Sequence, residues 1–222
     1  MKRLFILSLL FIATCAPIRP SVKPDLAPEP RTIPKITLTG SIDADSVAAA
    51  RAGLQELARE GSQTIVFEIN SGGGEVEEGF KLVKEIEEYP GRVICVVDGE
   101  GMSMAFYLLQ SCHTRYMTKR SVLMIHQPRF QRHGPPPDAI DAANLNGYQR
   151  ALSQAMVEHM AGRMGMAPDA MLDKIPSRLG WWLNWEEALC VNAVDAVVPS
   201  VGFVVDSLKD GELPVGLRCN PK

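Results

Sequence analysis

The chain has 222 residues, of which 46% are hydrophobic, and a formal net charge of −3. This length and composition supply enough apolar side chains for one substantial core, so we expect a single folded domain. Lysine and arginine do not cluster in any one segment, and aromatic residues make up only 6% of the chain. Both observations argue against nucleic acid as a partner.

Residues 1–15 are typical of an export signal. Lys2 and Arg3 precede an apolar run, residues 4–13, which is too short to span a bilayer but fits the hydrophobic part of a secretory signal. The segment IATC resembles a bacterial lipobox, which would make Cys15 the lipidated residue. Thr14 departs from the usual small residue before that cysteine, so ordinary signal cleavage, for example after Ala16, stays open. Either route predicts an exported protein, periplasmic or anchored to a membrane as a lipoprotein.

Residues 16–34 form a proline-rich segment, with prolines at positions 17, 20, 24, 28, 30 and 34. This spacing blocks helix formation and favours extended chain. We interpret the segment as a linker, although a disordered tail without such a role fits the composition equally well. The folded domain is then expected over residues 35–200, with a C-terminal extension over 201–222.

Predicted strands and helices alternate through this domain. Strands are expected at residues 35–40, 64–69, 92–97 and 121–125, and helices at 43–60, 75–91, after Ser103 and at 139–164. A short helix and a last strand are expected within 185–198. Asp45 or Ser46 is the expected cap of the first helix, and the methionines are interpreted as core residues. Repeated strand–helix–strand crossovers predict an α/β fold with a largely parallel sheet.

Three of the predicted strands run into residues that can carry chemistry. They end at the glycine turn NSGGG (70–74), at the turn that carries Ser103, and at His126. Because functional groups collect at the carboxyl ends of parallel strands, these three features are expected at one edge of the sheet. A serine hydroxyl becomes a nucleophile when a base takes its proton. Backbone N–H groups beside glycines can then stabilise the oxyanion that forms.

Each feature taken alone has a simpler interpretation. Ser103 would be the cap of the helix that follows it, and His126 a core histidine. The glycine turn would be a phosphate-binding loop, but the Lys-Ser/Thr pair of such loops is missing. The cysteines show no CxxC spacing, so no metal site is expected. It is the combination of the turn, the serine and the histidine that favours acyl-transfer chemistry.

Five segments resemble the Clp protease proteolytic subunit family in the same order: ITLTGSID, FEINSGGGEVEEGF, DGEGMSMAFYLL, MIHQP and WEEALCVNAVDAVV. The resemblance covers about residues 36–198. It implies the crotonase-like ββα superhelix of that family, with a long handle-like helix at 139–164. It also implies a serine endopeptidase that hydrolyses small or unfolded polypeptides without a cofactor and assembles into homo-oligomeric rings. An ATP-driven unfoldase partner is not expected for an exported chain, which has no ATP supply.

Carried over to this sequence, the resemblance makes Ser103 the nucleophile and His126 the general base. The N–H groups of Gly73 or Gly74 and of Met104 would form the oxyanion hole. The chain also departs from the family pattern: Gly72 replaces a proline, Met102 replaces a small residue, and Ala105 replaces a glycine.

The family's triad aspartate is also replaced, since a gapless match puts Gly180 in its place. Asp173, Asn184 or a backbone carbonyl would have to orient His126 instead. Two alternative functions therefore stay open: a Ser–Lys protease like the signal peptide peptidases of the same superfamily, and a non-catalytic oligomeric scaffold. If Cys15 carries lipid, four of the five cysteines are left, and their pairing cannot be read from the sequence.

Overall fold

The computed structural model describes residues 32–128, 138–175 and 179–219. The predicted export signal with Cys15 and nearly all of the predicted linker lie outside these residues. Within them, no helix is both long enough and apolar enough to cross a membrane.

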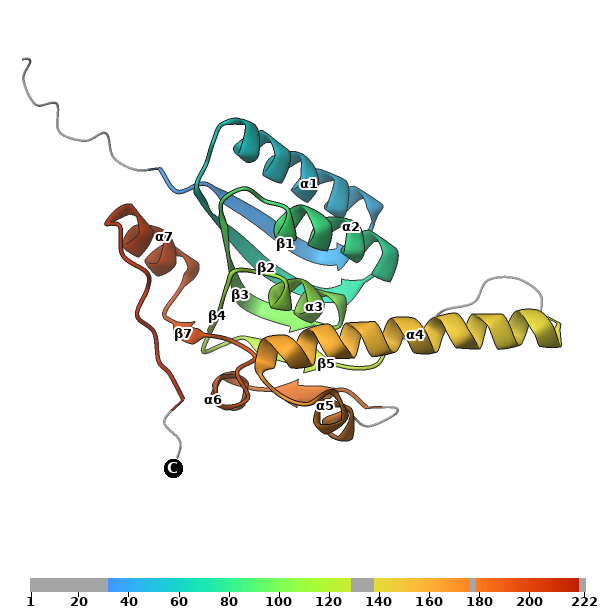
Figure 1. The fold of residues 1–222 in the computed structure, drawn as a ribbon. Coiled ribbons are helices and arrows are strands. Elements are labelled where there is room, and N and C mark those ends of the chain that lie inside the picture. The colour runs from blue at the N-terminus through green and yellow to red at the C-terminus, as the bar shows by residue number, and fades with distance from the viewer. Residues whose placement is uncertain (1–31, 129–137, 176–178, 220–222) are drawn as a thin grey trace, which may run out of the picture. The chain divides into compact units, whose positions relative to one another are not determined.

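A seven-stranded, mostly parallel sheet forms the centre of the fold (Figure 1). Its main path is β1 (Lys35–Ile42), β2 (Thr64–Gly74), β3 (Arg92–Met102), β4 (Thr114–Thr118) and β7 (Ala196–Val198). The end of β3 also pairs with β5 (Val122–Ile125), which pairs antiparallel with β6 (Trp181–Leu183). The predicted α/β class with a parallel sheet is confirmed.

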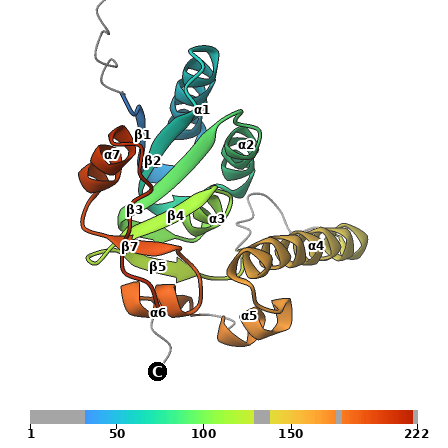
Figure 2. The ribbon, with the colours of Figure 1, turned by 60° about the vertical axis from the view of Figure 1, so that its left-hand side comes forward.

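Helices cover both faces of this sheet (Figures 1 and 2). One face packs against α1 (Ala44–Arg59), α2 (Val76–Glu87), α3 (Met104–Gln110) and the end of α4 (Ala139–Met164); α5 (Pro168–Lys174) and α6 (Trp185–Cys190) join the same cluster. The other face packs against α7 (Val201–Lys209). Strand β2 shows the alternation directly, since Ile65 and Phe67 join the first cluster and Val66 the second.

Two of the expected element boundaries were wrong. The glycine segment 70–74 is not a separate turn but the end of β2, where the register with β1 shifts between Thr39 and Ser41. Helix α1 is capped by Asp43, not by Asp45 or Ser46. The Asp43 carboxylate accepts the Ser46 N–H at 3.0 Å, and the Ser46 hydroxyl in turn accepts the Asp43 N–H at 3.0 Å. This reciprocal capping box starts α1 at Ala44, directly after Asp43.

The sequence also did not predict β4, β6, α5 and α7. The two strands have 5 and 3 residues and the two helices 7 and 9. Short elements give only a weak apolar repeat, although β5, α6 and β7 are as short and were predicted. They matter here because β6 holds the segment that faces His126.

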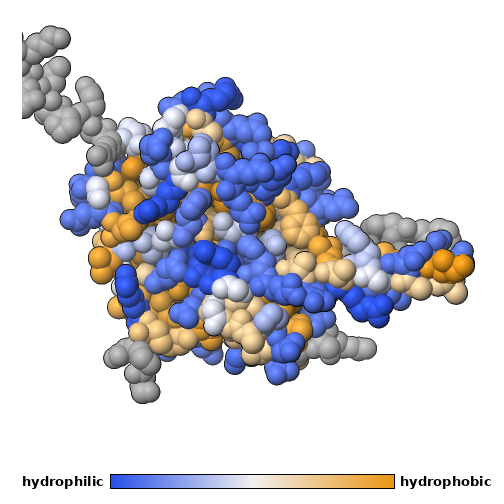
Figure 3. All heavy atoms as spheres, viewed as in Figure 1, coloured by the Kyte–Doolittle hydropathy of each residue, from blue (hydrophilic) through white to orange (hydrophobic). Residues whose placement is uncertain are grey.

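The long helix α4 has the expected bounds, but its apolar residues are buried only in its C-terminal part. Met156, Met160 and Met164 are buried, whereas the side chains near its start are exposed, Ile140 at 73% and Tyr148 at 56%. The first half of α4 extends beyond the sheet in Figure 1, and the space-filling view shows apolar residues at its far end (Figure 3). The predicted amphipathic helix is therefore packed over only part of its length.

A buried arginine holds the C-terminal end of α3 in place. Arg115 forms two hydrogen bonds from Nη2 and Nε to the Asp195 carboxylate, at 2.6 and 3.4 Å. Its Nη1 donates to Gln110 Oε1 at 2.6 Å and to the Arg163 carbonyl at 3.1 Å. Nearby, the Cys95–Cys112 disulfide joins β3 to the segment after α3, and Cys190–Cys219 joins α6 to the C-terminal segment. The C-terminal end of α3 is thus fixed relative to the sheet.

Candidate active site

Ser103 occupies the single residue between β3 and α3. Its backbone has φ of 54° and ψ of −119°, a conformation that a non-glycine residue adopts only when the surrounding structure imposes it. Its N–H donates to the Met124 carbonyl of β5 at 2.8 Å. Ser103 stands at the N-cap position of α3, yet its side chain makes no capping hydrogen bond. The interpretation of Ser103 as a simple helix cap therefore loses its support.

His126 lies beside Ser103 because β3 and β5 are parallel neighbours. Met102 pairs with Met124, so the residues that follow the two strands come to the same edge of the sheet. Ser103 and His126 both line a cavity of about 200 Å³. Within the described residues no hydrogen bond joins the Ser103 hydroxyl to the His126 ring. Such contacts are often loose without substrate and tighten when it binds.

The tautomer of the His126 ring follows from the hydrogen bond at Nδ1. Nδ1 lies 2.6 Å from the carbonyl oxygen of Gln127. A carbonyl oxygen can only accept, so Nδ1 carries the proton. In the neutral ring Nε2 then has the free electron pair. This is the tautomer in which Nε2 can accept a proton from a hydroxyl.

The glycine segment passes directly against Ser103. A Cβ atom at Gly73 would lie 2.7 Å from the Ser103 Cβ and 3.0 Å from the Met104 nitrogen, and Gly73 has φ of +95°. Gly74 lines the cavity together with Ser103, Met104 and His126. All five residues predicted for the site are thus brought together.

The predicted oxyanion donors differ in their hydrogen bonds. The Gly73 N–H donates to the buried Ser71 hydroxyl at 3.1 Å. Met104 is the first residue of α3, so no carbonyl one turn earlier in the helix accepts its N–H. Met104 is accordingly the donor best placed to meet a negative charge that develops beside Ser103.

Of the three groups considered for orienting His126, the structure supports one. The Asn184 side-chain oxygen instead accepts the N–H groups of Glu186 and Glu187 and caps α6. Among the described residues no hydrogen bond or ion pair joins Asp173 to His126. The backbone carbonyl of Gln127 is the group that the structure places on the ring.

The rest of the cavity wall is apolar. Val76, Ile125, Met156 and Met160 line it beside the serine and the histidine. The two methionines are one turn apart on α4, a spacing from which the sequence predicts only core packing. Their place in the cavity wall depends on where the C-terminal end of α4 packs, which no local sequence pattern indicates.

Tyr107 on α3 and His159 on α4 have pKa values that burial shifts. Burial, with a smaller contribution from Glu87, raises the pKa of Tyr107 to about 12. The Tyr107 ring lies 4.9 Å from the His159 ring, and burial lowers the pKa of His159 below its usual value. The described residues also contain no group of three or more His, Cys, Asp or Glu side chains that could hold a metal ion.

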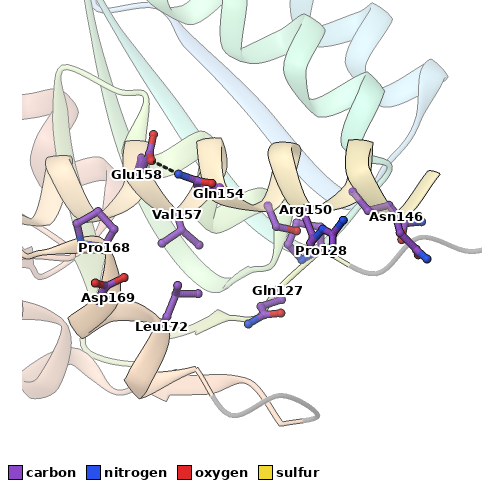
Figure 4. Close-up of a pocket in the computed structure, with 12 residues that line it drawn as sticks. Gln127, Pro128, Asn146, Arg150, Gln154, Val157, Glu158, Pro168, Asp169 and Leu172 are labelled. Carbon is purple, nitrogen blue, oxygen red and sulfur yellow. Dashed lines mark hydrogen bonds between the residues drawn. The ribbon is translucent and has the colours of Figure 1, made fainter. Parts of the chain in front are cut away.

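A larger and more polar groove opens next to this cavity, between α4 and α5 (Figure 4). Its volume is about 820 Å³, and Pro128 lines both the groove and the smaller cavity. Figure 4 shows Gln127 on one side, Val157 and Arg150 on α4, and Asp169 and Leu172 on α5. The groove leaves room for an extended chain beside Ser103.

Comparison with known proteins agrees with this architecture. A sequence profile of the Clp protease family matches residues 32–200. The chain belongs to the Clp protease family. Among curated members of that family, an ATP-dependent Clp protease proteolytic subunit 2 of Pseudomonas aeruginosa is 25% identical over 171 residues, which cover 75% of this chain and 81% of the relative. An ATP-dependent Clp protease proteolytic subunit 1 of Chlamydia caviae is 42% identical over 146 residues, covering 64% and 74%.

Proposed function

We propose that the protein is a serine-type endopeptidase that hydrolyses peptide bonds of small or unfolded polypeptides. The observation that carries the proposal is the strained backbone of Ser103. It places a serine without a capping bond at a cavity that His126 also lines. A strained turn between a strand and a helix is a recurrent way of exposing a nucleophilic serine.

In the proposed reaction the Ser103 Oγ attacks the carbonyl carbon of the scissile bond while His126 Nε2 accepts the hydroxyl proton. The N–H group of Met104, together with that of Gly73 or Gly74, stabilises the oxyanion of the tetrahedral intermediate. Use of the Gly73 N–H requires it to leave the Ser71 hydroxyl. His126 then returns the proton to the leaving amine, and a water molecule hydrolyses the acyl-enzyme by the same steps.

The dimensions of the cavity support a preference at the residue before the scissile bond. The cavity is small, about 200 Å³, and lined by aliphatic and thioether side chains. We propose that it accepts an unbranched or leucine-like apolar side chain and excludes charged ones, which would lose their hydration there without a partner.

We also propose an exported homo-oligomer, membrane-anchored through Cys15. The disulfides Cys95–Cys112 and Cys190–Cys219 support an oxidising compartment. They use four of the five cysteines, which leaves Cys15 as the one available for lipidation. The exposed apolar residues Ile140 and Tyr148 on α4 support contact with another subunit in a ring.

Two alternatives are weaker. A Ser–Lys protease needs a lysine at the serine, but among the described residues none lines the cavity that contains Ser103. A non-catalytic scaffold would explain the glycine at position 180. It does not explain why Ser103 is held in a strained conformation beside a histidine of the required tautomer.

A fluorophosphonate probe tests the proposal on the native protein. We expect phosphonylation of the peptide that contains Ser103, identified by mass spectrometry, and loss of that adduct in Ser103→Ala. The matched control is Ser111→Ala, because the Ser111 hydroxyl also lies near a histidine, 3.3 Å from His159 Nε2. The control should label like the native protein. A folded oligomer that takes up no probe would instead identify the scaffold.

A further inference from the structure

We propose that the Gln127 backbone carbonyl orients His126 in place of a carboxylate, and that Met124 keeps position 180 closed to any side chain that could supply one. This inference rests on the proposed function, because it assigns the partner of the proposed base. The reacting centre is then a Ser–His pair in which a main-chain carbonyl orients the histidine.

The first support is the geometry at the ring. The 2.6 Å contact between His126 Nδ1 and the Gln127 carbonyl uses the one Nδ1 proton. Within the described residues no Asp or Glu forms a hydrogen bond or ion pair with His126. The two internal segments outside the described residues, 129–137 and 176–178, contain neither aspartate nor glutamate in their sequence. Among the described residues, no carboxylate is therefore bonded to the ring in the way expected behind a catalytic histidine.

The second support is the pairing of β5 with β6. Met124 pairs with Trp182 and Ile125 with Trp181, in antiparallel register. The next positions along the two chains are His126 and Gly180, which therefore face each other. Position 180 is the place from which a side chain could reach the far side of the His126 ring.

The Met124 side chain already occupies the space beside position 180. A Cβ atom on residue 180 would lie 2.4 Å from the Met124 Sδ and 2.7 Å from its Cγ. Cγ is close to the Met124 backbone, and the carbonyl of the same residue accepts the Ser103 N–H. A side chain at position 180 therefore requires the Met124 side chain to rotate away or to be replaced by a smaller one.

The consequence concerns the charged form of the ring. When His126 accepts the Ser103 proton it becomes an imidazolium, and a neutral carbonyl stabilises that charge less than a carboxylate does. The structure thus predicts a working but slow base. Adding a carboxylate at position 180, once Met124 is shortened, should speed the acylation of Ser103.

The test compares Gly180→Asp/Met124→Ala with Gly180→Asn/Met124→Ala, which has the same shape but no charge, and with Met124→Ala alone. The rate of Ser103 phosphonylation by a fluorophosphonate is measured as a function of pH. We expect the aspartate variant to react at least about tenfold faster than the asparagine variant, because the imidazolium gains a charge-assisted hydrogen bond. The acidic limb of its pH–rate profile should also move to higher pH. Equal rates and equal limbs in the two variants would overturn the inference.

A second measurement needs no variant. Nitrogen-15 NMR of the native protein at neutral pH should find the His126 proton on Nδ1. A proton on Nε2, or a ring bonded to a carboxylate, would overturn the inference even if the double variants did not fold. Failure of the proposed function gives a different result, namely no phosphonylation of native Ser103.

Discussion

Replacing Gly73 with alanine should lower the rate of Ser103 acylation by about 10² to 10³, the loss that follows removal of one oxyanion donor. The new methyl group would lie 2.7 Å from the Ser103 Cβ and from the Met102 carbonyl oxygen, and 3.0 Å from the Met104 nitrogen. It also places an L residue at φ of +95°. Either Ser103 or the Met104 N–H must therefore move out of position. Acylation by a leucine ester measures the effect.

Gly72→Ala is the matched control. Its Cβ would approach nothing closer than 3.7 Å, the distance to the Glu100 carboxylate. We expect a rate within about threefold of the native protein, because surface substitutions away from special features change little. Equal losses in the two variants would show that the glycine segment is merely intolerant of side chains and would contradict the proposed role of its approach to Ser103.

Asp195→Ala should destabilise the fold by about 3 kcal/mol, since it leaves a buried guanidinium without its carboxylate. The Arg115 side chain is only 6% exposed, and Asp195 accepts hydrogen bonds from its Nε and Nη2. The bonds from Arg115 to Gln110 and to the Arg163 carbonyl persist, which keeps the loss below that of a fully isolated charge. Urea unfolding measures the difference in free energy.

The control for this change is Asp206→Ala on α7. Asp206 also forms an ion pair, with Lys209 at 3.0 Å, but both side chains are exposed. An exposed pair of this kind contributes less than about 0.5 kcal/mol. Similar losses in both variants would mean that the Arg115 cluster is not the structural anchor of α3 that its geometry indicates.

The site was largely predictable because it depends on local motifs and on one rule of topology. The sequence shows which residue follows each predicted strand. Because neighbouring strands are parallel, Ser103, His126 and Gly73 come to one edge of the sheet. The roles of these residues are still proposals, but their proximity is a confirmed prediction. The α/β class followed from the same alternation of strands and helices.

The features that could not be predicted from the sequence depend on contacts between short or distant segments. Strand β6 has three residues, so its pairing with β5, and hence the position of Gly180 opposite His126, had no local signal. The disulfide partners are 17 and 29 residues apart and come together only in the fold. Every residue has a main-chain carbonyl, so no residue type in the sequence indicates that the Gln127 carbonyl contacts His126.

The dependence of Ser103 acylation on His126 tests the central claim most directly. A chromogenic ester of an N-protected leucine should give a burst of product from the native protein, with the acyl group found on the peptide that contains Ser103. In His126→Ala the burst rate should fall by about 10² to 10⁴, the usual contribution of a general base. A burst in His126→Ala at the native rate, or an acyl group on any residue other than Ser103, would contradict the account.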